Sequence, residues 1–462
     1  MPHDAPETDY LVVGAGATAM AFVDTLLDHS DASVTIVDRR KAPGGHWNDA
    51  YPFVRLHQPS AWYGVVSRPV PETSGQGASS EHRATGAEVL AYFDRLMHER
   101  FLPSGRVTWL PGVDYLSGDH GIHQLRHVDG GGESLLTVRR KLVDATHART
   151  EVPATHPPKY AVAAGVQCVA PNRLPELELS FARYTVIGSG KTGMDACLWL
   201  LDNGVEAARI RWIRPRDAWL QDRANMQTGI QHFRGLIGQF DAIAEASDDA
   251  DLFARLEAGR LLCRIDESVQ PTTFRCAIVS RDELARLRSI EDVVRLGRVR
   301  AIEPTRICLD GGVEAAIADT LYINCSAGAL QPQPSLPVFD GNVINLLYVI
   351  RCRPLPSAAV IAYVESRFED EAEKNLLCAP VGLPEVPSDW LALWSATLNN
   401  MAQWAKHPAM NNWFNACRLS STALMTLGAD GVDASRLGRL RESSVKAGAA
   451  AVRLKQVMVS SR

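Results

Sequence analysis

The sequence predicts an α/β protein with two Rossmann-like dinucleotide-binding domains, a small β-meander and a C-terminal helical region. Near the N-terminus a glycine-rich turn lies between an apolar strand and a helical pattern, and the same arrangement recurs from residue 183. After residue 388 the pattern is helical. At 462 residues the chain is long enough for two or three domains.

The order of these patterns predicts the domain boundaries. We expect the first dinucleotide-binding domain to comprise residues 1–180 and 320–385, and the second to comprise residues 181–320. A charged, largely helical insertion is expected at 221–275, and the C-terminal helical region at 386–462. Turn residues separate three strand patterns of the expected β-meander, which are 106–110, 121–128 and 135–146.

Composition and charge exclude several classes of partner. A net charge of -5 gives no electrostatic reason to expect nucleic acid or an anionic membrane surface. The first apolar strand, at 10–13, lies too close to Met1 to leave room for a signal peptide, and no stretch is long and apolar enough to span a bilayer. We therefore expect a cytoplasmic protein that acts on small molecules. Its oligomeric state stays undecided, and a homo-oligomer is one alternative.

The cysteines and histidines show no pattern of a metal or redox site. None of the nine cysteines forms a Cys-x-x-Cys pair, and the thirteen histidines lack metal-ligand spacing. The sequence therefore predicts no metal site and no redox-active disulfide of the thioredoxin-reductase type. Most of the cysteines are expected to be small core residues in a reducing compartment.

The first glycine-rich turn predicts a dinucleotide site. It reads G-x-G-x-x-A, with Gly14, Gly16 and Ala19 at the fixed positions. Glycines allow the backbone to turn tightly and approach a pyrophosphate, and the helix that follows offers free N–H groups. Asp38 ends the next strand, 24 residues after Gly14, where a carboxylate can accept hydrogen bonds from a ribose.

The segment after this strand carries a more specific signal. Residues 39–47 form a basic run that ends in Gly-Gly-His-Trp, and residues 55–60 read Arg-Leu-His-Gln-Pro-Ser. In these features the chain resembles the flavin-containing monooxygenase superfamily, which includes Baeyer–Villiger and N-hydroxylating enzymes. The alternative is that Gly44 and Gly45 only make a turn and that Trp47 packs in the core. The resemblance implies FAD contacts from Arg39, Gly44, Gly45, Trp47, Gln58 and Ser60.

The same resemblance extends to residues 340–365. In this superfamily the start of a helix here points at the flavin ring, where its dipole favours negative charge. Ser357 and Ala358 are the implied contacts, and an N-cap role is an equal alternative for Ser357. His57, Gln58 and Ser60 are the candidates near the ring, although no catalytic side chain is assigned. His57 is expected to be a hydrogen-bonding neighbour rather than an acid–base catalyst.

The second glycine-rich turn reads G-x-G-x-x-G, with Gly188, Gly190 and Gly193 at the fixed positions. Lys191 and Thr192 suggest a phosphate-binding P-loop, but the glycine that such a loop requires is replaced by Thr185. An ATPase is therefore disfavoured. The turn instead predicts a second dinucleotide site, at which Lys191 and Thr192 are also expected to contact the ligand.

The residues after the next strand favour NADPH over NADH. Where a carboxylate would bind the ribose of NADH, this chain has Arg214 and Arg216. A guanidinium can pair bidentately with the 2′-phosphate of NADPH. The alternative is that these arginines are solvated or pair with Asp217 and Asp222.

The resemblance implies a reaction as well as two cofactors. NADPH would reduce FAD, and a C4a-(hydro)peroxyflavin would insert one atom of O2 into a small molecule by N-hydroxylation, S-oxidation or Baeyer–Villiger oxidation. The chain lacks the Phe-x-Gly-x-x-x-His-x-x-x-Trp signature of classical members. An NADPH-dependent flavin oxidoreductase without oxygen insertion and a flavin-binding redox sensor without turnover therefore stay open. The substrate pocket would lie among residues 221–275 and the C-terminal helices. Trp390 and Trp394 could line this pocket, but clustered aromatic residues at helical spacing more often belong to the core.

Overall fold

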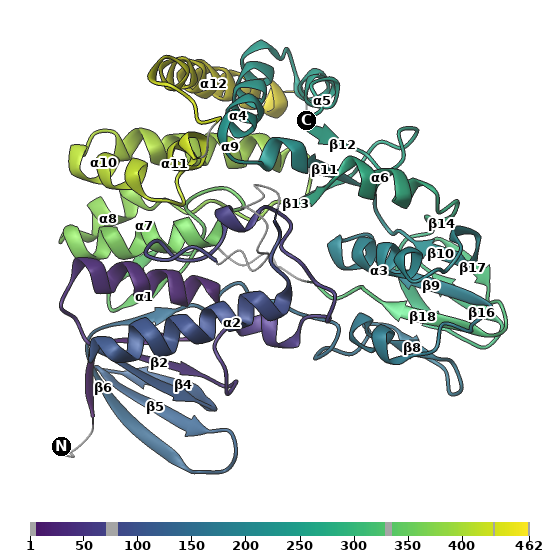
Figure 1. Cartoon of the computed structure of the whole chain (residues 1–462), viewed down its shortest axis with the longest axis horizontal. Coiled ribbons are helices and arrows are strands. Elements are labelled where there is room, and N and C mark those ends of the chain that lie inside the picture. The colour runs from purple at the N-terminus through teal and green to yellow at the C-terminus, as the bar shows by residue number, and fades with distance from the viewer. Residues whose placement is uncertain (1–5, 71–81, 329–334, 428–429, 461–462) are drawn as a thin grey trace.

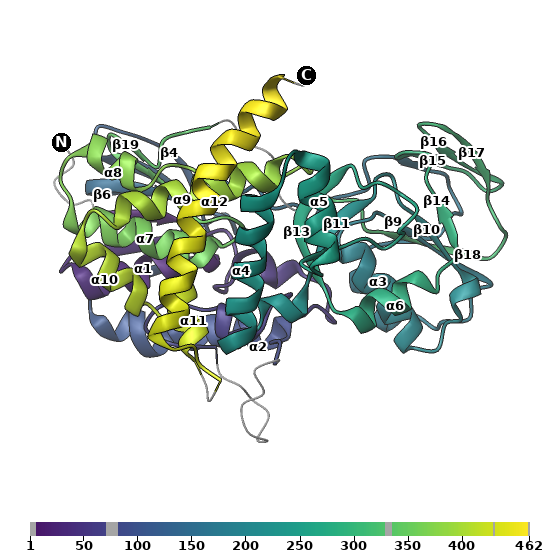
Figure 2. The same cartoon turned by 90° about the horizontal axis from the view of Figure 1, so that it is seen from above.

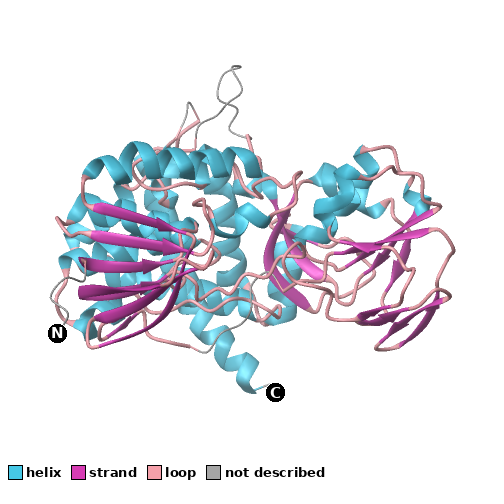
Figure 3. Ribbon diagram, turned by 90° about the horizontal axis from the view of Figure 1, so that it is seen from below, coloured by secondary structure: helices cyan, strands magenta, loops and turns pink. Residues whose placement is uncertain are grey.

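A computed structural model describes residues 6–70, 82–328, 335–427 and 430–460, with side chains to residue 456. Two separate β-sheets lie at opposite ends of an elongated molecule, and a layer of helices covers the first sheet and reaches the space between the two (Figure 1). Figure 3 shows the same division, with loops and helices between the two groups of strands.

The first sheet is mainly parallel. Its strands, in order across the sheet, are β19 (Phe339–Asp340), β20 (Val343–Asn345), β6 (Glu133–Asp144), β1 (Glu7–Val13), β2 (Val34–Asp38) and β3 (Val107–Pro111). Strand β2 is buried along its whole length, as expected for a parallel strand covered on both faces. Helices α1 (Ala17–His29) and α7 (Pro354–Arg367) pack against each other on one face.

Helix α2 (Gly86–Leu96) also belongs to this part of the molecule. It begins at a capping box in which Thr85 and Glu88 satisfy each other's backbone N–H groups. Its buried face includes Val89, Phe93 and Leu96, which join the core cluster that contains α1. The position of α2 is thus fixed both by its cap and by its apolar face.

The β-meander differs in part from the expectation. Strands β4 (Val113–Asp119) and β5 (Ile122–His127) form an antiparallel sheet with the first half of β6. The predicted strand at 106–110 corresponds to β3, which pairs in parallel with β2 and is not part of the meander. The meander uses β4 in its place, because Gly112 allows the chain to turn directly after β3 with a φ of 67°.

The second sheet corrects the expected domain boundaries. It is parallel, and its strands are β14 (Asp292–Val294), β10 (Ile210–Ile213), β9 (Arg183–Ile187), β18 (Thr320–Asn324) and β8 (Cys168–Val169). Residues 168–169 and 320–324 therefore belong to the second unit, although both were expected in the first. Helices α3 (Lys191–Asp202) and α6 (Arg281–Arg288) pack together beside this sheet.

A small four-stranded sheet extends the second unit. It consists of β17 (Gly312–Ala315), β16 (Arg306–Leu309), β15 (Val299–Ile302) and β7 (Ala161–Val162). Strand β7 comes from the proline-rich segment that connects the two units, and it pairs in parallel with β15. The connecting segment thus contributes an edge strand to each of the two sheets of this unit.

The insertion is not only helical. Helices α4 (Gly229–Glu245) and α5 (Asp249–Ala258) are present, but β11 (Ala218–Asp222), β12 (Leu262–Cys263) and β13 (Thr273–Val279) form a three-stranded sheet beside them. Sequence periodicity missed this sheet because its strands are short and far apart along the chain.

The C-terminal region is helical, as predicted. Helix α12 (Ala434–Ser460) runs alongside α4 of the insertion and also packs on α9 (Asp389–Trp404) (Figure 2). The described residues contain no helix long and apolar enough to cross a membrane. The two Rossmann-like units and the C-terminal helices confirm the predicted fold class. The helices after α7 are α8 (Glu371–Leu377), α9 (Asp389–Trp404), α10 (Pro408–Ala416), α11 (Ser421–Thr426) and α12 (Ala434–Ser460).

Candidate active site

A cavity of about 2480 Å³ lies where the two units, the insertion and the C-terminal helices meet. Single small-molecule sites commonly have volumes of about 300–1,000 Å³. The cavity is therefore large enough for more than one ligand. Both glycine-rich turns contribute residues to its wall.

The first glycine-rich turn opens the start of α1 onto this cavity. Gly16 is the N-cap of α1 and provides no side-chain cap, so the first N–H groups of the helix stay available to a ligand. Gly14 and Gly16 line the cavity, whereas Ala19 is fully buried in the helix. A Cβ added at Gly45 would lie 2.9 Å from the Gly16 Cα atom, so the close approach of these two loops requires glycine. This geometry fits a pyrophosphate.

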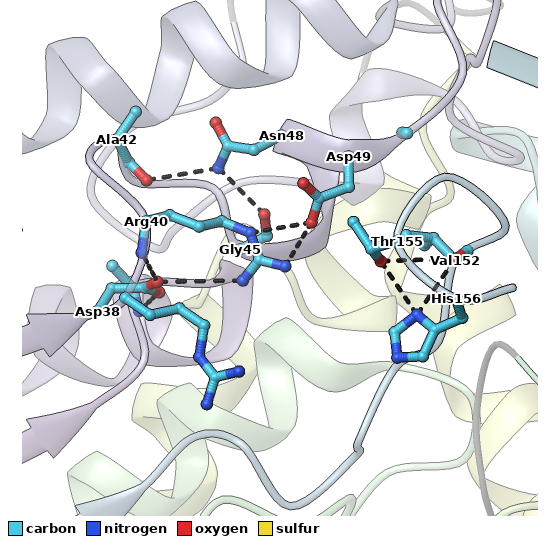
Figure 4. A network of polar contacts seen from close by, with 12 residues as sticks. Asp38, Arg40, Ala42, Gly45, Asn48, Asp49, Val152, Thr155 and His156 are labelled. Atoms are coloured by element: carbon cyan, nitrogen blue, oxygen red, sulfur yellow. Dashed lines mark hydrogen bonds and ion pairs between the residues drawn. The ribbon is translucent and has the colours of Figure 1, made fainter. Parts of the chain in front are cut away.

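Asp38 lies at the edge of the same site (Figure 4). Its carboxylate accepts hydrogen bonds from the backbone N–H groups of Ala15, at 2.7 Å, and Arg40, at 2.8 Å. The Arg40 side chain in turn forms an ion pair with Asp49. Asp38 thus fixes the glycine-rich turn and still has lone pairs for a ribose hydroxyl. Arg39 also lines the cavity and has a largely exposed side chain.

The Gly-Gly-His-Trp segment places one aromatic ring at the cavity. Trp47 lines the wall and its Nε1 atom donates a hydrogen bond to the Tyr63 hydroxyl at 2.8 Å. Gly45 lines the wall as well. Gly44 instead forms the left-handed N-cap of the short helix that carries Trp47, with a φ of 119°. Gly44 therefore shapes the segment, while Gly45 and Trp47 face the site.

Residues 57–60 divide into cavity and core. His57 and Gln58 line the cavity. Ser60 is buried, and its hydroxyl accepts a hydrogen bond from the Ala84 N–H at 2.9 Å. Ser60 does not line the cavity, and its expected contact with FAD stays a prediction. Burial and the nearby Lys191 lower the pKa of His57 to about 4. His57 is thus neutral at pH 7 and unsuited to act as an acid.

Ser357 and Ala358 are displaced from their expected role. The Ser357 hydroxyl accepts hydrogen bonds from the backbone N–H groups of Val349, at 3.1 Å, and Ile350, at 3.0 Å. Ala358 is buried, and Arg353 rather than Ser357 is the N-cap of α7. The N-cap expectation for Ser357 is therefore wrong, and the FAD contacts of Ser357 and Ala358 stay predictions. The residues that line the cavity at this point are Arg353, Pro354, Leu355 and Pro356.

The second glycine-rich turn repeats the geometry of the first. Gly190 is the N-cap of α3 without a side-chain cap, and Gly188, Gly190, Lys191 and Thr192 line the cavity. Gly193 has a packing role, since a Cβ added there would lie 2.1 Å from the Gly188 carbonyl oxygen. The helix N-terminus that results can accept a second pyrophosphate.

Charged residues of the second unit hold the loop of the first unit that carries His57. Lys191 is ion-paired with Asp195, which also accepts a hydrogen bond from the Tyr51 hydroxyl at 2.7 Å. The Arg223 guanidinium donates to the His57 carbonyl oxygen at 2.8 Å and to Glu283 at 2.7 Å. These contacts connect the second unit and the insertion to the Tyr51 and His57 region of the first unit.

Glu283 is the most strongly perturbed carboxylate of this junction. Burial by itself would raise its pKa, but Lys191 and Arg223 outweigh burial and lower the pKa to about 2. The carboxylate is therefore charged at pH 7, and its bond to Arg223 holds that guanidinium beside the His57 carbonyl oxygen of the first unit.

Arg214 and Arg216 have different surroundings. Arg214 is buried behind the wall and its guanidinium is ion-paired with Asp217, so the structure does not bring it to the site. Arg216 lines the cavity and pairs with Glu385 at 3.2 Å. Arg298 and Arg300, which sequence reasoning missed, line the cavity as well. Of the two arginines expected at this site, only Arg216 lines the cavity.

The cysteines differ from the expectation in one respect. Cys276 and Cys352 form a disulfide with a Cα–Cα distance of 6.3 Å, and both residues line the cavity. They are 76 residues apart in the sequence, so local spacing gave no sign of the pair. The other seven cysteines are free. Within the described residues no cluster of His, Cys, Asp or Glu side chains could hold a metal ion.

Sequence reasoning also missed most of the wall contributed by the insertion. The only local signal was the Arg-Cys-Arg-Pro run at 351–354, which places two basic residues directly before a helix start. The remaining wall residues come from elements that are distant in sequence. Among them are Tyr51, His232 and Gln239.

Comparisons with known proteins identify the class of proteins that shares this fold. No protein-family model matches the chain. A cyclohexanone-bound cyclohexanone monooxygenase shares the fold with a TM-score of 0.51 at 12% identity, over 79% of this chain and 86% of the other. The polycyclic ketone monooxygenase of Thermothelomyces thermophila also gives 0.51 at 12% identity, over 97% and 89%. The fold is therefore that of flavin-containing monooxygenases.

The sequence itself belongs to a narrower family. The chain is 47% identical over 430 residues to "Uncharacterized protein Rv2000" of Mycobacterium tuberculosis, which covers 91% of this chain and 79% of the relative. "Uncharacterized protein Mb2023" of Mycobacterium bovis matches with the same values. This chain is a member of the family that these mycobacterial proteins represent.

Proposed function

We propose that this protein is an FAD- and NADPH-dependent monooxygenase, which inserts one oxygen atom from O2 into a small molecule. The observation that carries the proposal is the pair of helix N-termini, capped by Gly16 and Gly190, that open onto one cavity. Each can bind a pyrophosphate, and a shared cavity brings the reactive rings of two dinucleotides together. The flavin monooxygenase fold supports the same assignment.

The two turns differ in the ligand that they favour. FAD is assigned to the first turn, because Asp38 can accept from a ribose and Trp47 and Gln58 line the adjoining wall. NADPH is assigned to the second turn, because Arg216 lines the wall where the ribose would lie. The carboxylate beside it, that of Glu385, is already paired with Arg216. The residues proposed to hold FAD are Gly14, Gly16, Asp38, Arg39, Gly45, Trp47 and Gln58, and those for NADPH are Gly188, Gly190, Lys191, Thr192 and Arg216.

Bound FAD would supply the hydride acceptance and the reaction with oxygen. The residues of this chain would orient the two dinucleotides and limit proton supply. His46 and His57 both line the cavity, and burial lowers the pKa of each to about 4. Neutral imidazoles cannot deliver a proton readily at pH 7, so these two side chains would restrict proton transfer to a bound flavin. N-hydroxylation, S-oxidation and Baeyer–Villiger oxidation all fall within this proposal.

One observation favours a second candidate. The Cys276–Cys352 disulfide lines the same cavity and could accept two electrons. The protein would then be an NADPH-dependent flavin oxidoreductase without oxygen insertion. In the overall reaction, NADPH, a proton and the disulfide give NADP⁺ and two thiols. Bound flavin would transfer the electron pair from NADPH to the disulfide.

Rapid-mixing spectroscopy tests the two candidates. The flavin-loaded protein is reduced with NADPH without oxygen and then mixed with oxygen. The monooxygenase predicts an absorbing species that differs from both oxidised and reduced flavin, and Cys352→Ser should leave this species in place. Direct return to oxidised flavin with equimolar hydrogen peroxide would count against oxygen insertion. Two new thiols for each NADPH consumed before oxygen is added would identify the second candidate.

A further inference from the structure

Arg351 is a buried cation without an acidic partner. The residue is 9% exposed, lines the cavity, and takes part in no ion pair with any described carboxylate. Its Nη2 atom donates to the Gln239 side-chain oxygen at 3.0 Å, while its Nη1 atom is buried and has no hydrogen-bond partner. Burial lowers the pKa of Arg351 to about 9. A buried guanidinium is costly unless an anion pairs with it.

The neighbours of Arg351 come from the insertion and the C-terminal helices. The guanidinium lies 4.1 Å from the centre of the Trp394 ring, and the Arg351 N–H donates to the Thr397 hydroxyl at 2.9 Å. Gln239 belongs to α4 and Trp394 to α9. The Trp394 indole offsets part of the free-energy cost of burying the guanidinium, but the N–H donors of Arg351 still have no carboxylate partner. These groups lie on other elements than the two glycine-rich turns, although they line the same cavity.

A second cation faces the same cavity. Arg353 lines the wall, lies 4.9 Å from the centre of the Trp62 ring, and donates to the Leu419 carbonyl oxygen. It forms no ion pair with a described carboxylate. The neighbouring His232 is buried with both ring nitrogens unpartnered, and burial followed by Arg353 lowers its pKa to about 3. The positive charge of the wall is thus not neutralised by the protein.

Helix α4 aligns these groups. His232 and Gln239 are seven residues apart, which is about two turns or roughly 10 Å along a helix, and both line the cavity. The surface that continues from them is apolar. It is made by Leu236, Phe240, Trp394, Leu398 and Met425.

We propose that this wall binds an organic acid, whose carboxylate pairs with Arg351 and whose apolar body lies along α4 and α9. This inference rests on the proposed function and names the substrate class of that site. A carboxylate matches the guanidinium fork and would satisfy the free Nη1 donor. Arg353 adds a second positive charge that favours an anion in the same cavity.

Calorimetric titration of the full-length, FAD-loaded protein tests this proposal. The probes are 4-phenylbutyrate and its neutral counterpart 4-phenylbutyramide, each added with and without saturating NADP⁺. We expect the carboxylate to bind roughly tenfold or more tightly than the amide. This preference should persist with NADP⁺ bound. Equal affinity for the two probes, no binding of either, or loss of the preference with NADP⁺ would overturn the proposal.

Variants locate the effect. Arg351→Met should remove the preference for the carboxylate, while Arg255→Met, which removes one positive charge on α5, should retain it. If Arg351→Met fails to fold, Arg351→Lys replaces it and should weaken the carboxylate selectively, because lysine lacks the planar fork. A preference that survives these changes at Arg351 would overturn the proposal. The titration measures binding and requires no turnover. A protein that fails to insert oxygen can therefore still show the preference for the carboxylate, so failure of the proposed function and failure of this inference are distinguishable.

Discussion

Arg214 and Arg216 follow the same strand, yet only Arg216 faces the cavity. We predict that Arg216→Ala weakens NADP⁺ binding roughly tenfold, because a charge-assisted bond to the 2′-phosphate is lost. Binding of NAD⁺, which lacks that phosphate, should change little. Titration with both nucleotides measures the difference, and an equal loss for both would contradict the role of Arg216.

Arg214 should instead affect stability. Arg214→Ala removes one partner of a buried ion pair with Asp217, and we expect the free energy of unfolding to fall by about 3 kcal/mol. Arg255→Ala is the matched control, since its pairs with Asp251 and Glu245 are exposed and should cost less than about 1 kcal/mol. Urea denaturation compares them. Similar losses in the two variants would show that burial of Arg214 is unimportant.

The lowered pKa of Glu283 predicts a pH dependence. A carboxyl group whose pKa falls from 4.5 to about 2 on folding stabilises the folded state above pH 4.5 and loses this contribution as the pH falls toward 2. Glu283→Gln should therefore lower the free energy of unfolding by roughly 2–3 kcal/mol at pH 7. The difference from the unmodified protein should shrink progressively below pH 4.5. A difference independent of pH would rule out the charge of Glu283 as its cause.

Single residues were predictable where a motif fixes backbone geometry. Gly14, Gly16, Gly188 and Gly190 lie at the cavity because their turns are local. Ser60 and Ser357 do not line the cavity, since their hydroxyls bond to backbone groups that only the folded chain brings near. Local sequence does not reveal such partners.

At the scale of elements, α7 depends on Ser357. The residue fixes the turn before the helix by accepting two buried backbone N–H groups. Ser357→Ala leaves both donors unsatisfied, and we expect the free energy of unfolding to fall by roughly 2 kcal/mol. Ser366→Ala, on the same helix, is the control because its hydroxyl only donates to the Tyr363 carbonyl oxygen. Flavin content per folded molecule should stay unchanged in Ser357→Ala. A selective loss of flavin would instead indicate that Ser357 contacts FAD.

Elements with strong periodicity were predicted better than those held by distant pairing. The strands and helices next to both glycine-rich turns follow from local patterns. The three-stranded sheet of β11, β12 and β13 was missed, because its pairing depends on residues up to about 60 positions apart. The strand at 320–324 was assigned to the wrong unit for the same reason, since its partner β9 lies more than 100 residues earlier.

At the scale of the whole molecule, the site exists only where all regions meet. The first unit supplies Asp38 and Trp47, the second supplies Lys191 and Arg216, and the insertion and C-terminal helices supply Gln239 and Trp394. Helix α12 packs on both α4 and α9 and thereby connects the insertion to the C-terminal helices. The sequence predicted the two dinucleotide turns, but their shared cavity and its cationic wall emerge only from the tertiary arrangement.

Hydride transfer between the two dinucleotides tests this arrangement most directly. The purified protein, loaded with FAD, is mixed with NADPH or NADH in the absence of oxygen while the visible absorbance of the flavin is followed. We predict that NADPH bleaches the flavin rapidly and that NADH does so much more slowly. A protein that binds no FAD, or whose bound FAD keeps its absorbance in the presence of NADPH, would contradict the assignment of two cofactors to one cavity.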